Sequence, residues 1–288
     1  MKLFSNISNM INEKRTKKAA ERAKQYSERM EYLLSEKTPS DIMEAFRNLK
    51  ATLSVSMPKK EGGTVLMMTS AYPKDGKTTV TVNLAMMFAL SNAKVVLVDA
   101  DIRKGRIARY FKHKSTPGLA DYLSGQASFD EVIHKSPVNE NLSYIACGTH
   151  SPKPYELLES EQMKLLIEQL KTQYDYVIID TPPVLLLSDA LAVAPLTDGT
   201  VLVCRHQVSY VSDVARALHT LTFAKVNVLG AVVNDYKTNS ISHSYYGGYK
   251  HYLYYSKSYL EPEFPDEASA EAATSDATAT ATTTESAE

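Results

Sequence analysis

Short, continuous runs of apolar residues separated by amphipathic segments constrain the fold of this chain more than any other feature. Six of these runs, rich in β-branched residues, are expected as strands: residues 64–69, 94–98, 142–146, 176–179, 200–204 and 226–233. Helical spacing predicts helices between them, at residues 78–91, 154–171, 187–194 and 208–223. Because the runs do not alternate with polar residues, both faces of each strand should be covered. The pattern therefore predicts an α/β fold, a mostly parallel sheet with helices on both faces, whose ligands bind at the carboxyl ends of the strands.

Charge and cysteine content exclude several classes of protein. The 288 residues carry 32 Lys and Arg against 33 Asp and Glu, a formal net charge of -1, which argues against a nucleic-acid partner bound by phosphate neutralisation. The two cysteines, Cys147 and Cys204, each lie inside an apolar run, so neither a disulfide framework nor a cysteine metal site is expected. No stretch approaches the roughly 20 apolar residues that span a bilayer, and the first residues lack the apolar core of a signal peptide. We therefore expect a cytoplasmic protein.

A strand, a loop and a helix follow one another at residues 64–91, with Gly76-Lys77-Thr78 at the turn. Inward backbone N–H groups and a helix N-terminus make such a loop a cradle for phosphates, and Lys77 could reach the β- and γ-phosphate oxygens while the Thr78 hydroxyl ligates Mg²⁺. The usual first glycine of this motif is Ala71 here, so the motif taken alone leaves a plain βα turn possible. The candidate nucleotide-binding residues are Lys74, Asp75, Gly76, Lys77, Thr78 and Thr79.

Carboxylates follow two other expected strands. Asp99 and Asp101 end the second strand, and Asp180 ends the fourth, at the edge of the sheet where the phosphate loop also lies. A carboxylate there can hold Mg²⁺ or accept a proton from an attacking hydroxyl. One isolated aspartate is more often a helix cap, but this set in this order favours a site for ATP and Mg²⁺.

These motifs resemble those of P-loop ATPases with a second Walker-type aspartate strand, the group of the positioning ATPases and the bacterial tyrosine kinases (BY-kinases). Over residues 40–260 the chain is similar to the BY-kinases of capsular and exopolysaccharide synthesis, in its phosphate loop and in residues 99–103 and 179–183. Tyr72 replaces the signature lysine of the positioning ATPases. The resemblance implies an ATP-dependent protein-tyrosine kinase with the catalytic residues Lys77, Asp99, Asp101 and Asp180, and Mg²⁺ on Thr78, Asp101 and Asp180. The resemblance favours Asp99 as the base.

Tyrosines are concentrated near the carboxyl end of the chain. Of 18 tyrosines, seven lie within residues 243–260, where chance would place about one: Tyr245, Tyr246, Tyr249, Tyr252, Tyr254, Tyr255 and Tyr259. An aromatic surface patch for a partner is one interpretation. By resemblance, these tyrosines are the phosphoacceptors that BY-kinases phosphorylate in trans.

The N-terminal residues are expected to form two helices, at 12–35 and 39–55. Apolar residues within 3–11 precede a basic run and could lie on an anionic membrane surface, although a helix packed on its own domain is commoner. Glu44 and Arg47 could form a surface ion pair of small value. The resemblance implies instead that Glu44, Arg47 and Lys50 contact an adjacent subunit of a ring, and Lys50 stands where the family has arginine.

We therefore expect four regions: a helical region for docking or oligomerisation (1–58), a P-loop kinase domain (59–242), the tyrosine cluster (243–260) and a disordered tail (261–288) with eight acidic residues and no Lys or Arg. By resemblance, the partners are a transmembrane activator or polysaccharide co-polymerase acting through its cytoplasmic tail, further copies of the chain and a cognate tyrosine phosphatase. The kinase would be recruited to the inner face of the cell membrane and regulate polysaccharide synthesis and export.

Two alternatives remain at this point. A nucleotide-switched positioning or scaffold ATPase without phosphotransfer explains the Walker residues equally well, but not the tyrosine cluster. An inactive regulator that binds nucleotide and uses the aromatic segment for docking is the second, and the intact Lys77, Thr78 and Asp180 argue against it.

Overall fold

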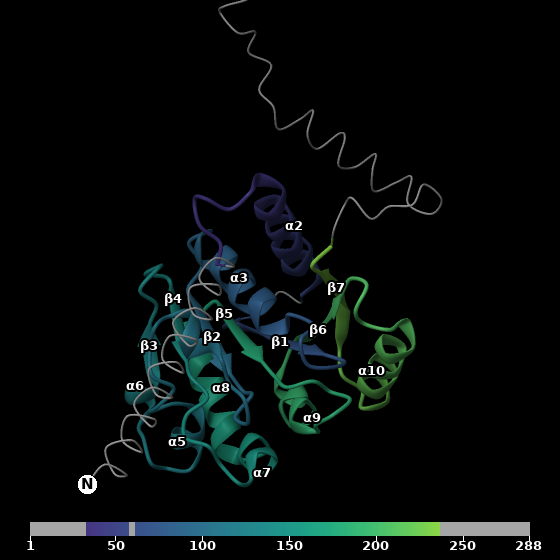
Figure 1. Cartoon of the computed structure of the whole chain (residues 1–288). Coiled ribbons are helices and arrows are strands. Elements are labelled where there is room, and N and C mark those ends of the chain that lie inside the picture. Colours follow the sequence, from purple (N-terminus) through teal and green to yellow (C-terminus); the bar gives the residue numbers. More distant parts are fainter. Residues whose placement is uncertain (1–32, 58–60, 237–288) are drawn as a thin grey trace, which may run out of the picture. The chain divides into compact units, whose positions relative to one another are not determined.

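A seven-stranded sheet forms the centre of the computed structural model, which describes residues 33–57 and 61–236 (Figure 1). The strand order is β3-β4-β2-β5-β1-β6-β7, and only β3 runs antiparallel to its neighbour. The strands are β1 (Thr64–Ser70), β2 (Val95–Asp99), β3 (Ile133–Lys135), β4 (Leu142–Ile145), β5 (Tyr176–Asp180), β6 (Gly199–Arg205) and β7 (Val228–Asn234). The mostly parallel α/β sheet expected from the apolar runs is confirmed.

The six expected strands are all present, with ends that differ by one or two residues. β3 was not expected, because three residues with the sequence Ile-His-Lys are too few to show a period. β3 pairs with β4 at the sheet edge, with Ile133 opposite Ile145. The antiparallel edge strand thus depends on its partner strand rather than on its own sequence.

The helices agree less closely with expectation. They are α2 (Ser40–Ser56), α3 (Lys77–Ala89), α4 (Ile107–Tyr110), α5 (Leu119–Leu123), α6 (Phe129–Val132), α7 (Pro154–Leu158), α8 (Glu161–Gln173), α9 (Asp189–Val193), the 3-10 turn η1 (Ala194–Leu196) and α10 (Val211–Phe223). The single helix expected at 154–171 is wrong, because Ser160 accepts a hydrogen bond from the Met163 amide and starts a new helix there. The short helices α4, α5 and α6 were not expected.

Of the two expected N-terminal helices, the one at 39–55 is confirmed as α2, and the other is tested only at its end. Of the helix expected at 12–35, residues 33–35 are described, and they are not helical. Leu33 and Leu34 are buried, and the Leu34 amide donates a 2.9 Å hydrogen bond to Oδ1 of Asn83 in α3. Residues 1–32, the tyrosine cluster and the acidic tail lie outside the described residues. In the described part of the chain, no helix is both long and apolar enough to cross a membrane.

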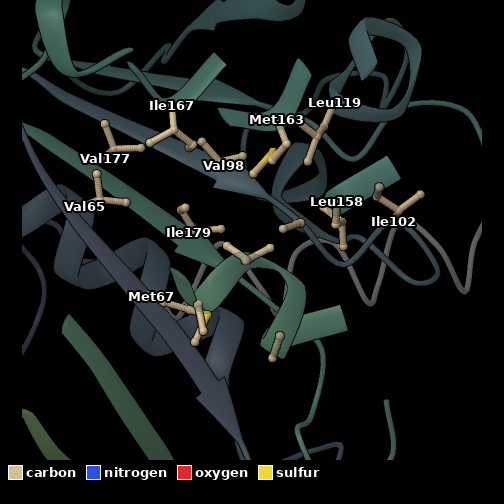
Figure 2. Packing of buried hydrophobic residues seen from close by; sticks show 14 of the residues in the cluster. Val65, Met67, Val98, Ile102, Leu119, Leu158, Met163, Ile167, Val177 and Ile179 are labelled. Atoms are coloured by element: carbon tan, nitrogen blue, oxygen red, sulfur yellow. The ribbon is translucent and has the colours of Figure 1, made fainter. Parts of the chain in front are cut away.

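The two faces of the sheet have separate hydrophobic cores. Alternate residues of β1 show the division, since Val65 and Met67 pack with α5, α7, α8, α9 and α10, whereas Leu66 and Met68 pack with α2, α3 and α4. Figure 2 shows the first core, where side chains of β1, β2 and β5 face Met163 and Ile167 of α8. Burial on both faces explains why the strands are continuous apolar runs.

Helix α3 lies deepest in the second core. Eleven of its 13 residues are buried, because α2 packs on the side of α3 that the sheet does not cover. The first turn of α3 follows β1 directly, and β5 and β2 are the next strands along the sheet. This order brings the carboxyl ends of β1, β5 and β2 together, with Asp99 opposite Asp180.

Candidate active site

The phosphate loop closes at a position that requires glycine. Gly76 is the N-cap of α3 and has a φ of 86°, in the left-handed region. A Cβ atom there would lie 1.8 Å from Nδ2 of Asn234 at the end of β7. That amide donates a 3.0 Å hydrogen bond to the carbonyl oxygen of Asp75. The loop is therefore held by a residue that lies 159 positions after Asp75 in the sequence.

Asp180 accepts hydrogen bonds from three side chains in the first turns of α3. Lys77 Nζ lies 2.6 Å from Oδ1, Thr78 Oγ1 lies 2.7 Å from Oδ2, and Thr81 Oγ1 lies 3.1 Å from Oδ1. The Lys77 and Asp180 side chains are 8% and 1% exposed, so they form a buried ion pair. These contacts bring together an ammonium, a hydroxyl and a carboxylate, the groups that bind phosphate and Mg²⁺.

Asp99 has the same place on β2 as Asp180 on β5 but different partners. Its Oδ2 accepts a 2.9 Å hydrogen bond from the Ile107 amide, whereas its Oδ1 is buried without a hydrogen-bond partner among the described residues. Burial, followed by the negative charge of Asp180, raises the pKa of Asp99 to about 8. A carboxyl group with this pKa can take up or release a proton near neutral pH, as a general acid or base does.

The segment that follows Asp99 is held by hydrogen bonds within itself and to helix α9. Asp101 Oδ1 accepts a 2.9 Å hydrogen bond from the Lys104 amide, and burial raises the pKa of Asp101. Arg103 binds the fully buried Asp189 of α9 through Nε at 2.8 Å and Nη2 at 3.2 Å. This bidentate ion pair joins the segment after β2 to the helix that follows Asp180.

The remaining loop candidates face different neighbours. Lys74 is exposed with a φ of 75°, and the structure gives it no contact with the other site residues. The buried Asp75 carboxylate accepts hydrogen bonds from the Tyr72 amide at 3.2 Å and the Ser209 hydroxyl at 2.8 Å, so it braces the loop itself. Thr79 Oγ1 lies 2.8 Å from the Tyr110 hydroxyl.

The candidate oligomerisation residues lie together on α2. Arg47 Nη1 is 3.2 Å from Oε2 of Glu44, one turn away, and the Arg47 side chain is 58% exposed. Lys50, half-buried, follows on the same helix face. The pair predicted from the spacing is thus formed within the helix.

Sequence reasoning missed four residues that hold the site: Thr81, Asp189, Ser209 and Asn234. Thr81 stands four positions after Lys77, so a helix starting at the loop would have placed it on the same face. The other three come from segments with no phosphate-binding motif, and only the fold brings them to the loop.

The residues fit ATP and Mg²⁺. A 13-residue helix begins at the loop, Gly76 leaves the space that a Cβ would fill, and Asp99 keeps one buried oxygen without a partner. Residues 33–57 and 61–236 contain no cluster of three or more His, Cys, Asp or Glu side chains that could hold a metal ion.

Comparisons with known proteins agree on one family. The AAA domain family matches residues 74–226, more than half of the chain. The tyrosine-protein kinase YwqD of Bacillus subtilis is 35% identical over 206 residues, which cover 72% of this chain and 85% of YwqD. The kinase domain of Escherichia coli tyrosine kinase ETK aligns with a TM-score of 0.63 and 35% identity, over 70% of this chain and 80% of that one.

Other matches are partial. The E. coli tyrosine-protein kinase etk is 36% identical over 72% of this chain but only 28% of its own length, and the chain spans about a third of the length of the curated relatives that it matches first. The septum site-determining protein MinD of Pyrococcus horikoshii, at 24% identity and a TM-score of 0.53, shares the fold. Together with the YwqD and ETK matches, the fold and the converging strand ends establish that the chain belongs to the bacterial tyrosine-protein kinase (BY-kinase) family.

Proposed function

We propose that this protein is an ATP-dependent tyrosine kinase that phosphorylates the tyrosine cluster of another copy of the chain and thereby regulates capsular or exopolysaccharide synthesis and export. One observation carries the proposal: at the carboxyl ends of β1, β2 and β5, the Lys77 ammonium of the phosphate loop lies on Asp180, and Asp180 lies opposite Asp99, whose pKa is raised.

ATP binding uses the loop amides, Lys77 and the start of α3. The Lys77 ammonium, now on Asp180, turns to the β- and γ-phosphate oxygens, and the Asp180 carboxylate keeps the Thr78 and Thr81 hydroxyls in place. Mg²⁺, held by Thr78, Asp180 and Asp101, would neutralise charge on the transferred phosphoryl group. Lys74, Asp75 and Thr79 contribute the shape of the loop.

Phosphotransfer needs a proton acceptor beside the phenol. The phenol oxygen of the substrate forms a bond to the γ-phosphorus as the bond to the β-phosphate oxygen breaks, and the phenolic proton passes to the Asp99 carboxylate. Tyrosine has a reference pKa near 10, so a carboxylate with a pKa of about 8 accepts this proton with less loss of free energy than one of ordinary pKa near 4. Asp99 is therefore assigned as the base.

The wider role follows the relatives. The proposal includes three partners: a transmembrane activator with a cytoplasmic tail, a cognate phosphatase, and further copies of the chain in a ring that uses Glu44, Arg47 and Lys50. The kinase would act at the inner face of the cell membrane and would have no nucleic-acid partner. Support comes from the names of relatives: one is described as a kinase from a cps region.

The test is intact-mass analysis and anti-phosphotyrosine detection on purified protein with Mg-ATP, with and without a candidate activator peptide. We expect several phosphates on the natural chain and none on Lys77→Met. A chain ending at residue 242 should keep ATP binding but lose most of its phosphotyrosine.

The Lys77→Met variant leaves Asp180 buried without its cation, so its fold must be checked by circular dichroism. Asp99→Asn provides a second variant, which should bind ATP but transfer phosphate about 100-fold more slowly or worse. If the protein hydrolyses ATP but forms no phosphotyrosine in the presence of an activator that binds, the kinase hypothesis is wrong and the positioning ATPase is favoured.

A further inference from the structure

A pocket of about 520 Å³ lies beside Asp99, on the side away from the phosphate loop. Its wall comes from the segment after β2, residues 102–106, 109 and 115–116, and from the segment after β4, residues 147–150. Four basic side chains, Arg103, Lys104, Arg106 and Arg109, and the imidazole of His150 line it. None of the lining residues is acidic. The pocket therefore suits an anionic ligand.

Most of this charge is available to a ligand. Arg103 is bound to Asp189, but Lys104, Arg106 and Arg109 are exposed, and the structure gives them no ion pair within the described ranges. Residues 103–114 contain six Lys or Arg and no Asp or Glu. Burial raises the pKa of the Cys147 thiol to about 12, so this side chain adds no negative charge to the wall.

The pocket borders the carboxyl group assigned as the base. Gly105 lines the pocket, and a Cβ atom on it would lie 2.7 Å from Oδ2 of Asp99 and 2.6 Å from the Cys147 sulfur. Along the sheet edge, the order is phosphate loop, Asp180, Asp99 and then the basic pocket. A peptide that brings a tyrosine to Asp99 thus places neighbouring residues against the basic wall.

We infer that this pocket binds phosphotyrosine, so that a peptide already phosphorylated at one tyrosine is held while another is presented to Asp99. The inference rests on the proposed kinase function and deepens it. Consecutive tyrosines of the cluster are one to four residues apart, and residues 243–260 have no acidic residue. Before phosphorylation the basic pocket offers this segment no charge attraction, and each phosphate adds about -1.5 to -2 charges. The first phosphate is therefore slow and the later ones follow faster.

Shape favours a phosphorylated side chain over a membrane surface. A lipid headgroup layer is broad and flat, whereas these basic side chains line an open pocket of about 520 Å³ that also contains Gly105, the neighbour of the Asp99 carboxylate. A phosphate monoester carries about -1.5 to -2 charges and three acceptor oxygens, so it can bind two basic side chains at once, which favours phosphotyrosine over a single carboxylate.

Binding is measured with the full chain and a fluorescent synthetic peptide of residues 243–260, either phosphorylated at Tyr252 or not. The phosphopeptide should bind about tenfold or more tightly than its unphosphorylated form. Arg106→Ala/Arg109→Ala should remove that difference. Lys94→Ala/Lys135→Ala is the matched control: it also removes two positive charges, but beside a pocket at the opposite ends of the strands, and should leave the difference unchanged.

Several results would overturn the inference. Equal affinity for the two peptides would do so, as would an unchanged preference in the Arg106/Arg109 variant. If Mg-ADP abolishes binding of the phosphopeptide, the peptide's phosphate binds at the phosphate loop and not in the basic pocket. Binding to vesicles with anionic lipid, without a preference for the phosphopeptide, would make the surface a membrane site. The assay needs no phosphotransfer, so its failure is distinct from that of the kinase proposal.

A kinetic measurement adds a second readout. When only part of the natural chain has reacted, intact-mass analysis should find mainly unphosphorylated and multiply phosphorylated molecules. The Arg106→Ala/Arg109→Ala chain should instead accumulate singly phosphorylated protein, because each phosphate is added in an independent encounter. The same mass distribution in both chains would contradict the inference.

Discussion

Asp180 and Asp99 occupy equivalent positions at the ends of neighbouring parallel strands, yet their surroundings differ in kind. Asp180 accepts hydrogen bonds from an ammonium and two hydroxyls. Asp99 accepts one from a backbone amide and keeps one buried oxygen without a partner among the described residues. Both side chains belong to residues that are 1% exposed. Burial is thus equal, and the partners alone distinguish the two carboxyl groups.

Strand position brings both carboxylates to the site, while helix α3 determines which side chains each one contacts. The first turns of α3 direct Lys77, Thr78 and Thr81 toward β5 and leave β2 without a cation in contact. Asp180 therefore holds an ammonium and two hydroxyls in place, whereas Asp99, with its pKa raised to about 8, can exchange a proton near neutral pH.

Asp180→Asn should have the largest effect on stability. It leaves the Lys77 ammonium buried without its partner, and breaking a buried ion pair from one side costs about 3 kcal/mol. Urea unfolding at pH 8 should show this loss against the natural chain. Asp99→Asn under the same conditions is the control, because it removes a carboxylate that has no cation in contact. A loss below about 0.5 kcal/mol in Asp180→Asn would mean that the pair contributes no more than a surface pair.

Asp99→Asn should change the pH dependence of stability. Folding raises the pKa of Asp99 to about 8 from its ordinary value of 3.8, so the stability contributed by the protonated carboxyl group is present at low pH and is lost as pH rises toward and through 8. Asparagine does not titrate and keeps an oxygen for the Ile107 amide. The melting temperature of the variant, relative to that of the natural chain, should therefore rise by about 10 °C between pH 5 and pH 8.5, measured without nucleotide or metal. A constant difference across this range would contradict the raised pKa.

Arg103→Lys tests what fixes the separation of the two carboxyl groups. The bidentate pair with Asp189 connects the segment after Asp99 to the helix after Asp180, and lysine keeps the charge but loses the second hydrogen bond. We expect a loss of about 1 kcal/mol in unfolding free energy and a lower kcat with little change in the KM for ATP. A change in the KM for ATP alone would assign Arg103 to nucleotide binding instead.

The sequence carries much of this site because its chemistry lies in local motifs. The apolar runs predicted the sheet, and the residues directly after them, Lys77, Thr78, Asp99 and Asp180, predicted which side chains meet. The partners of those side chains were not predictable in the same way. Ser209, Asn234 and Asp189 come from distant segments whose spacing carries no signal, and the burial that raises the pKa of Asp99 exists only in the packed sheet.

The predicted bounds of a helix were wrong where a single residue ends one helix and begins the next. Ser160 divides the helix expected at 154–171, because its side chain and carbonyl together satisfy the ends of two helices. The roles in oligomerisation and phosphate acceptance stay predictions, since they concern other copies of the chain or residues outside those described.

Arg47→Ala should have the smallest effect on folding and separates the site from the proposed ring. Its ion pair with Glu44 is exposed, so the loss in unfolding free energy should be below about 0.5 kcal/mol. If Arg47 also contacts an adjacent copy, light scattering should show a smaller particle, while the pH dependence of stability that Asp99 contributes stays the same in the separated chains. Ala45→Ser, an exposed change on the same helix, is the control and should keep the particle mass. An unchanged mass in Arg47→Ala would remove this helix face from the ring, because the pair would then serve only the helix that contains it.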